Sequence, residues 1–149
     1  MLDAIRKIFS GPGNNRVDDA AREMPIAIAA LLVEAAVADD NYADTEKALI
    51  QRLLVEDFAV AATDVAAVMA AAEQRQKDSV DLYRFVRVVK TLPPAGKIKL
   101  VESLWRVILS DGERQSDEDA LVRRVCGLIN VEDIDSGLAR QRVQKELEA

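Results

Sequence analysis

Hydrophobic and polar positions alternate along most of this chain with the spacing of amphipathic α-helices. Val101, Leu104, Trp105 and Ile108 follow the i, i+3, i+4, i+7 pattern that places one helix face in a core, so we expect Trp105 to be buried. Similar spacing, together with glycine, proline and capping residues, predicts helices over about 1–9, 17–38, 44–58, 63–76, 79–92, 95–110, 116–129 and 134–147. The pattern therefore predicts an all-α, single-domain helical bundle of about seven to eight helices.

The segment from Met24 to Ala38 is apolar on nearly every side of the predicted helix. A helix without a polar face belongs at the centre of a domain, so we expect this one to be the buried central helix. Pro25 could bend or restart it. Glu34 is its only charge after Pro25, and three fates are open: an ion pair with an arginine, which is the commonest outcome, a place at the rim, or a side chain directed towards an acidic site.

The two halves of the chain resemble each other. When Asp39 is aligned with Asp111, Glu46 falls on Glu118 and the apolar positions of the flanking helices coincide. Each half then reads as an apolar helix, an aspartate at its end, a short acidic connection, and a glutamate in the first turn of the next helix. Self-similarity of this kind indicates a duplicated structural unit.

This repeat sets the expected domain organisation. We predict an N-terminal amphipathic helix and loop over 1–16, followed by one helical domain over 17–149. Within that domain we expect two related halves built on helical hairpins, at about 26–75 and 98–147.

Composition excludes several classes of function. The net charge is −6 and the pI about 4.8, and an acidic protein repels phosphate backbones, so nucleic-acid binding is not expected. Histidine is absent, which removes the serine–histidine–aspartate and cysteine–histidine arrangements and histidine metal sites. The single cysteine, Cys126, lies in an apolar run and cannot form a disulfide within the chain. We therefore expect a non-enzymatic, cytoplasmic protein.

The candidate chemistry lies in the acidic connections. Asp39, Glu46, Asp111 and Glu118 could converge on a metal site made only of oxygen ligands, which would suit Ca²⁺, Mg²⁺ or Mn²⁺. The alternative is purely structural: carboxylates in a first turn stabilise a helix through its dipole, and Asp44 and Ser116 have the character of N-caps.

Two stretches, 33–46 and 105–118, are similar to the tellurite-resistance protein B family (TerB-like proteins). That family has two copies of an alanine–aspartate–glycine segment followed by a glutamate, on an all-helical fold. This chain departs from the pattern in the first copy, where Asp40 replaces the glycine, and in the second, where Ser110 replaces the alanine. The resemblance implies metal binding through acidic residues and a scaffolding or sensing role in tellurite resistance or another stress response.

Two binding functions follow from this reading. One is a metal-linked binding domain, and the other is a protein-interaction module without a metal. Other proteins are the expected partners in both cases, and the sequence leaves homo-oligomerisation open. The N-terminal segment, with Arg6 and Lys7 beside an apolar face, could touch a membrane surface peripherally, although packing back onto the domain is the favoured outcome.

Overall fold

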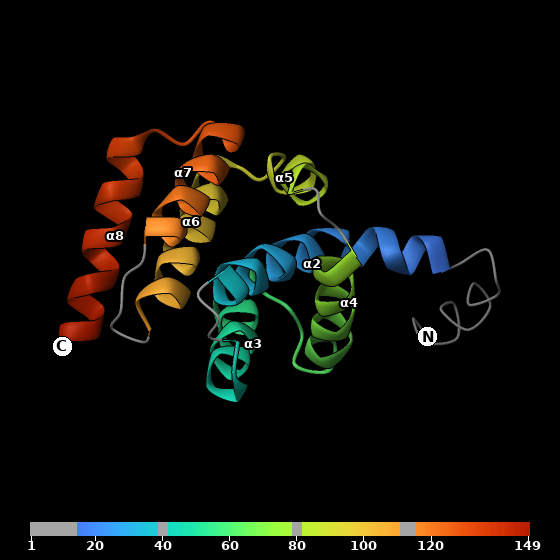
Figure 1. Ribbon diagram of the computed structural model, residues 1–149. Coiled ribbons are helices and arrows are strands. Elements are labelled where there is room, and N and C mark those ends of the chain that lie inside the picture. The colour runs from blue at the N-terminus through green and yellow to red at the C-terminus, as the bar shows by residue number, and fades with distance from the viewer. Residues whose placement is uncertain (1–14, 39–41, 79–81, 111–115) are drawn as a thin grey trace.

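The computed structural model describes residues 15–38, 42–78, 82–110 and 116–149, without the side chains of 15–21 and 116–119. This part of the chain forms seven α-helices and no strand (Figure 1). The all-α fold class is therefore confirmed, while the short helix expected at 1–9 lies outside the described residues. The helices are α2 (Asn15–Ala38), α3 (Asp44–Phe58), α4 (Val65–Asp78), α5 (Tyr83–Val89), α6 (Pro94–Leu109), α7 (Ser116–Ile129) and α8 (Asp133–Glu148).

Helix α2 is the central element, as its all-round apolar sequence predicts. It continues through Pro25, and every apolar side chain from 26 to 36 is buried. Helices α3, α4, α5, α6 and α7 all contact it, so hydrophobic burial surrounds it. Although α2 is the longest helix of the described residues, none of the helices there is long and apolar enough to cross a membrane.

Helices α2 and α4, the first and third helices of the N-terminal half, run in the same general direction. Arg22 in α2 pairs with Asp64, just before α4, at 3.5 Å. Near the other end of both helices, the Gln76 amide donates a hydrogen bond of 2.7 Å to Glu34. Of the three fates that the sequence left open for Glu34, the described residues show the place at the rim: this half-buried carboxylate accepts its hydrogen bond from a neutral amide of α4, and no described arginine pairs with it.

Helices α6 and α8, the first and third helices of the C-terminal half, also run in the same general direction. The Arg142 guanidinium lies 3.6 Å from Glu102, and that of Arg106 donates hydrogen bonds of 3.0 and 2.9 Å to Glu146 one turn later. The alignment of the two halves places Arg106 on Glu34, so at this position each apolar helix extends a polar side chain to the third helix of its own half. The duplication itself stays a prediction.

Arg106 also connects the halves. Its guanidinium pairs with Asp57 of α3 at 3.2 Å as well as with Glu146 of α8. The hydrogen bond with Glu146 raises the pKa of Arg106 and lowers that of Glu146. Because a half-buried charge is stable only with partners, this arginine favours one placement of α3, α6 and α8.

Helices α3 and α7 end in similar ways. The residues that follow them, Ala59 and Asn130, have left-handed φ values of 55° and 63°. The next residue in each case is a buried valine whose N–H returns to the helix, Val60 to the Leu54 carbonyl at 3.0 Å and Val131 to that of Cys126 at 2.9 Å. These left-handed caps reverse the chain tightly and lead it into α4 and α8.

One boundary differs clearly from the sequence prediction. Helix α4 was expected to end near residue 76 and the next helix to begin near 79, but α4 continues to Asp78 and α5 begins at Tyr83. Arg75 and Lys77 occupy the last turn of α4, where cations offset the helix dipole, and Gln74 donates a side-chain hydrogen bond to Asp78 at 2.9 Å. These local interactions favour the extra turn.

Trp105 lies in the core between α6 and α8, as predicted. The residue is 5% exposed, its indole N–H donates to Ser136 Oγ at 3.3 Å, and the Arg140 guanidinium lies 5.5 Å from the ring centroid. The indole therefore fills the space between the two helices with its one polar atom satisfied.

We predict that Trp105→Ala lowers the free energy of unfolding by roughly 3–5 kcal/mol, because the space left by the indole cannot collapse fully. Urea denaturation followed by circular dichroism measures this loss. Leu138→Ala on α8 is the control, since Leu138 is 47% exposed and its truncation should cost far less. Equal losses in the two variants would contradict the assignment of Trp105 to the core.

Candidate functional site

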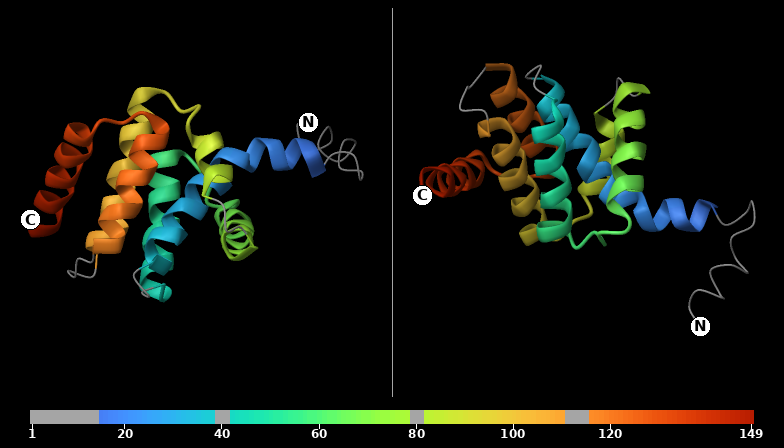
Figure 2. Two further views of the ribbon diagram at one scale, coloured as in Figure 1. Left: turned by 45° about the horizontal axis from the view of Figure 1, so that its top comes forward. Right: turned by 90° about the horizontal axis from the view of Figure 1, so that it is seen from below.

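The two acidic connections begin and end at the same end of the bundle. The carboxyl ends of α2 and α6 lie beside each other in both views of Figure 2, and α3 and α7 start nearby. Ser110, just after α6, and Leu49 of α3 line one hollow of about 430 Å³, which places the end of α6 against the first half of α3. The fold thus holds the helix ends that flank the two connections close together.

Glu46 is the one predicted metal ligand whose side chain is described. It is 9% exposed and lies in the first turn of α3. Its Oε2 atom accepts hydrogen bonds from the backbone N–H of Ala43 at 3.0 Å and from the hydroxyl of Thr45 at 2.9 Å. A glutamate at this position that reaches back to the residue before the helix is half of a capping box.

This arrangement corrects one expectation about capping. Asp44 is the first residue of α3 and Ala43 occupies the N-cap position, so Asp44 is not the cap. Alanine has no side-chain acceptor, and the capping therefore comes from Glu46 alone. The other expected cap, Ser116, is the first residue of α7, and its side chain lies outside the described residues.

The remaining three predicted ligands stay untested. Asp39 and Asp111 lie outside the described residues, and Glu118 lies in α7 with its side chain undescribed. Among the residues whose side chains are described, no group of three or more acidic or cysteine side chains could hold a metal ion.

Glu46 can nevertheless take part in a cation site. A carboxylate offers about four lone-pair positions, and Oε1 receives no hydrogen bond from the described residues. Oε2 could keep its capping bonds while Oε1 contacts a cation, which fits the all-oxygen ligand set that Mg²⁺, Ca²⁺ and Mn²⁺ prefer.

A second polar cluster lies next to Glu46, and the sequence did not indicate it. Glu73 of α4 accepts a hydrogen bond from the Tyr42 hydroxyl at 2.9 Å and pairs with Lys47 at 3.3 Å. Burial, and then the bond to Glu73, raises the pKa of Tyr42, so the phenol stays protonated and acts as a donor. The cluster fixes the start of α3 against α4. In the sequence, the feature that could have pointed to this cluster is Tyr42, an aromatic residue inside an acidic connection.

The lone cysteine does not contribute to this region. Cys126 is fully buried in α7, and burial raises the pKa of its thiol. A protonated thiol without solvent access is a poor nucleophile and a poor metal ligand, so Cys126 acts as a core residue.

Comparison with known proteins gives one match. The family model described as "Tellurite resistance protein TerB" matches residues 25–141, which covers α2 from Pro25 onward, α3 to α7, both acidic connections and about half of α8. No curated protein and no solved structure matches the chain.

We predict that Glu46→Ala lowers the free energy of unfolding by roughly 0.5–2 kcal/mol, because the Ala43 N–H loses its acceptor. Glu46→Gln should cost much less, since its amide oxygen can still accept that bond. Chemical denaturation in metal-free buffer measures both variants, with Glu56→Ala on the exposed side of α3 as the control. A Glu46→Ala protein as stable as the control would show that the cap contributes nothing.

Proposed function

Because this chain belongs to the family of the tellurite resistance protein TerB, we propose that it is a non-enzymatic binding domain that takes up a divalent cation, Mg²⁺, Ca²⁺ or Mn²⁺. The proposed ligands are Asp39, Glu46, Asp111 and Glu118. The cell would use the domain in the cytoplasm, in tellurite resistance or another stress response.

One observation carries the cation site, namely that the carboxyl ends of α2 and α6 lie beside each other (Figure 2). Asp39 follows Ala38, the last residue of α2, and Asp111 comes two residues after the end of α6. Helices whose ends are held together bring the start of both acidic connections to one region. Carboxylates gathered there would repel one another, and a divalent cation would offset that repulsion.

The second candidate is a protein-interaction module without a metal. The capping bonds of Glu46 favour it, because they give this buried carboxylate a structural role that needs no cation. In this case the acidic connections serve only to begin α3 and α7. The two candidates differ in what a cation does to stability.

We predict that a cation bound only by the folded protein raises its melting temperature, with a gain of about 2.7 kcal/mol at a concentration one hundred times the dissociation constant. Asp39→Asn combined with Asp111→Asn should abolish the rise and keep the fold. Asp133→Asn combined with Asp135→Asn is the matched control, because it removes the same charge from the exposed first turn of α8.

Calorimetric titration with each cation provides the decisive comparison. Binding that the Asp39 and Asp111 pair of substitutions removes, and the α8 pair does not, supports the cation site. No heat and no change in melting temperature at millimolar Mg²⁺, Ca²⁺ or Mn²⁺ would reject it and leave the interaction module.

A further inference from the structure

One segment of this acidic protein is exclusively basic. Between residues 82 and 100 the only charged side chains are five cations, in a chain whose net charge is −6. Four of the five are exposed, Lys97 is half-buried, and none makes an ion pair with another described residue. We call this set the basic surface: Arg84, Arg87, Lys90, Lys97 and Lys99.

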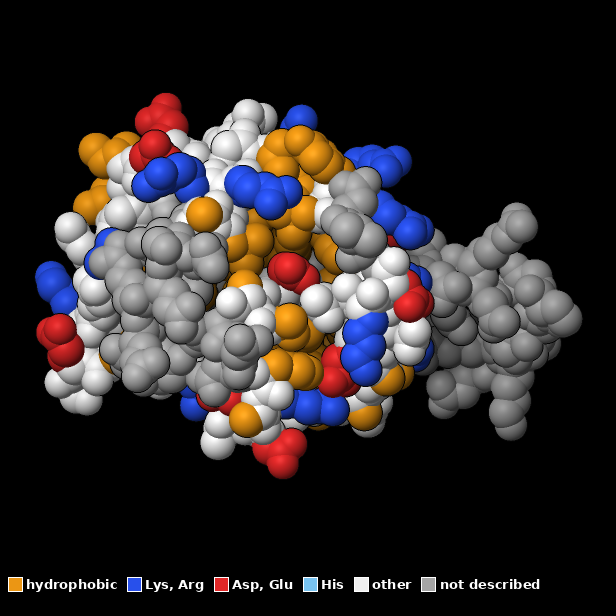
Figure 3. Space-filling view, viewed as in Figure 1, with side chains coloured by type: hydrophobic (Ala, Val, Ile, Leu, Met, Phe, Trp, Pro, Cys, Tyr) orange, Lys and Arg blue, Asp and Glu red, His pale blue; other side chains and the backbone are white. Residues whose placement is uncertain are grey.

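The basic surface lies away from the acidic connections. It follows α5 and the first turns of α6, whereas the second acidic connection begins beyond the last turn of α6. From Lys99, the last of these cations, to the end of α6 at Leu109 is ten residues, roughly 15 Å or about two Debye lengths at physiological salt, so the basic surface is largely screened from the second connection. In Figure 3, Lys and Arg side chains gather around the part of the face where α5 lies.

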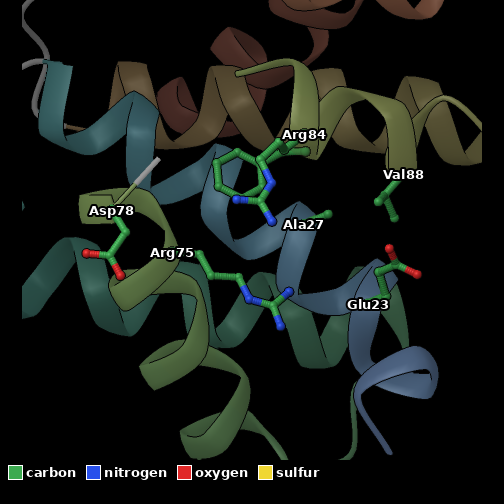
Figure 4. A pocket seen from close by; sticks show the side chains of 7 residues that line it. Glu23, Ala27, Arg75, Asp78, Arg84 and Val88 are labelled. Atoms are coloured by element: carbon green, nitrogen blue, oxygen red, sulfur yellow. The ribbon is translucent and has the colours of Figure 1, made fainter. Parts of the chain in front are cut away.

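Beside the basic surface lies a hollow, so a ligand can make apolar as well as charged contacts in this region. It has a volume of about 200 Å³ between α2, α4 and α5, and apolar side chains from Ala27, Phe85 and Val88 line it. Arg75 of α4 and Arg84 of α5 extend towards it from two sides (Figure 4). A cavity of about 150 Å³ is large enough for a benzene ring, so this hollow can take one apolar side chain.

Arg75 and Arg84 have no carboxylate partner among the described residues. Neither guanidinium makes an ion pair within the described part of the chain, although Glu23 and Asp78 also line the hollow. Each guanidinium therefore keeps N–H donors for an incoming anion, since the two carboxylates that line the hollow lie beyond ion-pair distance. The planar guanidinium presents paired N–H donors that match a carboxylate.

We propose that the hollow and the basic surface together bind an acidic peptide segment of a partner protein. One apolar side chain of that peptide occupies the hollow, and carboxylates on either side of it contact Arg75 and Arg84. Arg87 in α5 and Lys90, the residue after its end, are exposed cations that would meet further acidic residues of the peptide.

The geometry favours a peptide over a membrane or a nucleic acid. A flat bilayer cannot fill a concave hollow, and a long polyanion would extend beyond the basic surface onto the remaining surface of a chain whose net charge is −6. A short peptide can place its carboxylates against Arg75 and Arg84, and salt screens it from charges more than about 8 Å away at physiological ionic strength. This proposal is independent of the cation site at the other end of α6.

The test is a binding assay with the full chain in buffer containing a chelator. The probe is a fluorescein-labelled peptide with one leucine between two pairs of glutamates, and fluorescence anisotropy reports its binding. We expect Arg75→Ala combined with Arg84→Ala to weaken binding by at least about tenfold. Arg52→Ala combined with Lys145→Ala, two exposed cations on α3 and α8, should leave it unchanged.

Two further binding measurements distinguish a side chain bound in the hollow from attraction between charges alone. A peptide with alanine in place of leucine should bind several-fold more weakly, and Val88→Phe, which fills the hollow without changing the charge, should weaken the leucine peptide to a similar level. Circular dichroism confirms that each variant is folded.

Several outcomes would overturn the proposal. These are no peptide binding, equal weakening by the arginine pair and the control pair, or affinity that does not depend on the leucine. Tighter arginine-dependent binding to phosphatidylserine vesicles or to duplex DNA than to the peptide would overturn it as well, and would assign the surface to that partner.

Discussion

The burial of α2 from Ile26 to Ala36, where only Glu34 is half-buried, is the constraint on which this structure depends. A helix that is apolar on nearly every side from residue 26 to 36 cannot lie on a surface, and five other helices contact it. The burial of α2 also determines where the neighbouring helices lie. It sets α3, α4 and α6 against α2, and the ends of α2 and α6 then define the region from which both acidic connections start.

Charged side chains at the edge of the core determine how the surrounding helices are placed. Glu34 and Arg106 occupy equivalent positions in the two aligned halves, and each joins the third helix of its own half. Arg106 additionally holds Asp57 of α3, so the half-buried network crosses between the halves. These charges are paired internally, so neither proposed binding site draws on them.

The sequence predicted the helices well because their periodicity is strong and tertiary packing follows it. The all-round apolar pattern identified α2 as the central helix, and the spacing of Trp105 with its neighbours predicted its burial. Hydrogen-bond partners were harder to predict. The amide of Gln76 reaches Glu34 only because α2 and α4 run in the same direction, a relation that no local pattern expresses.

The functional regions were predictable only where their residues are close in sequence. The acidic connections repeat along the chain and were therefore recognisable, although the capping role of Glu46 required the backbone geometry at Ala43. The hollow between α2, α4 and α5 combines side chains separated by up to about sixty residues, so composition and periodicity could not reveal it. Its arginines belong to two helices whose contact with α2 becomes visible only in the fold.

Hydrogen exchange of the α2 backbone amides tests the central role of this helix most directly. If burial on all sides makes α2 the core of a single cooperative unit, the amides of Ile28, Leu31 and Leu32 should exchange only through global unfolding. Their exchange free energies would then equal the unfolding free energy from denaturant titration, and amides near the end of α8 would exchange more easily. Exchange of those α2 amides at a clearly lower free energy would contradict the account, because the helix could then open while the rest of the bundle stayed folded.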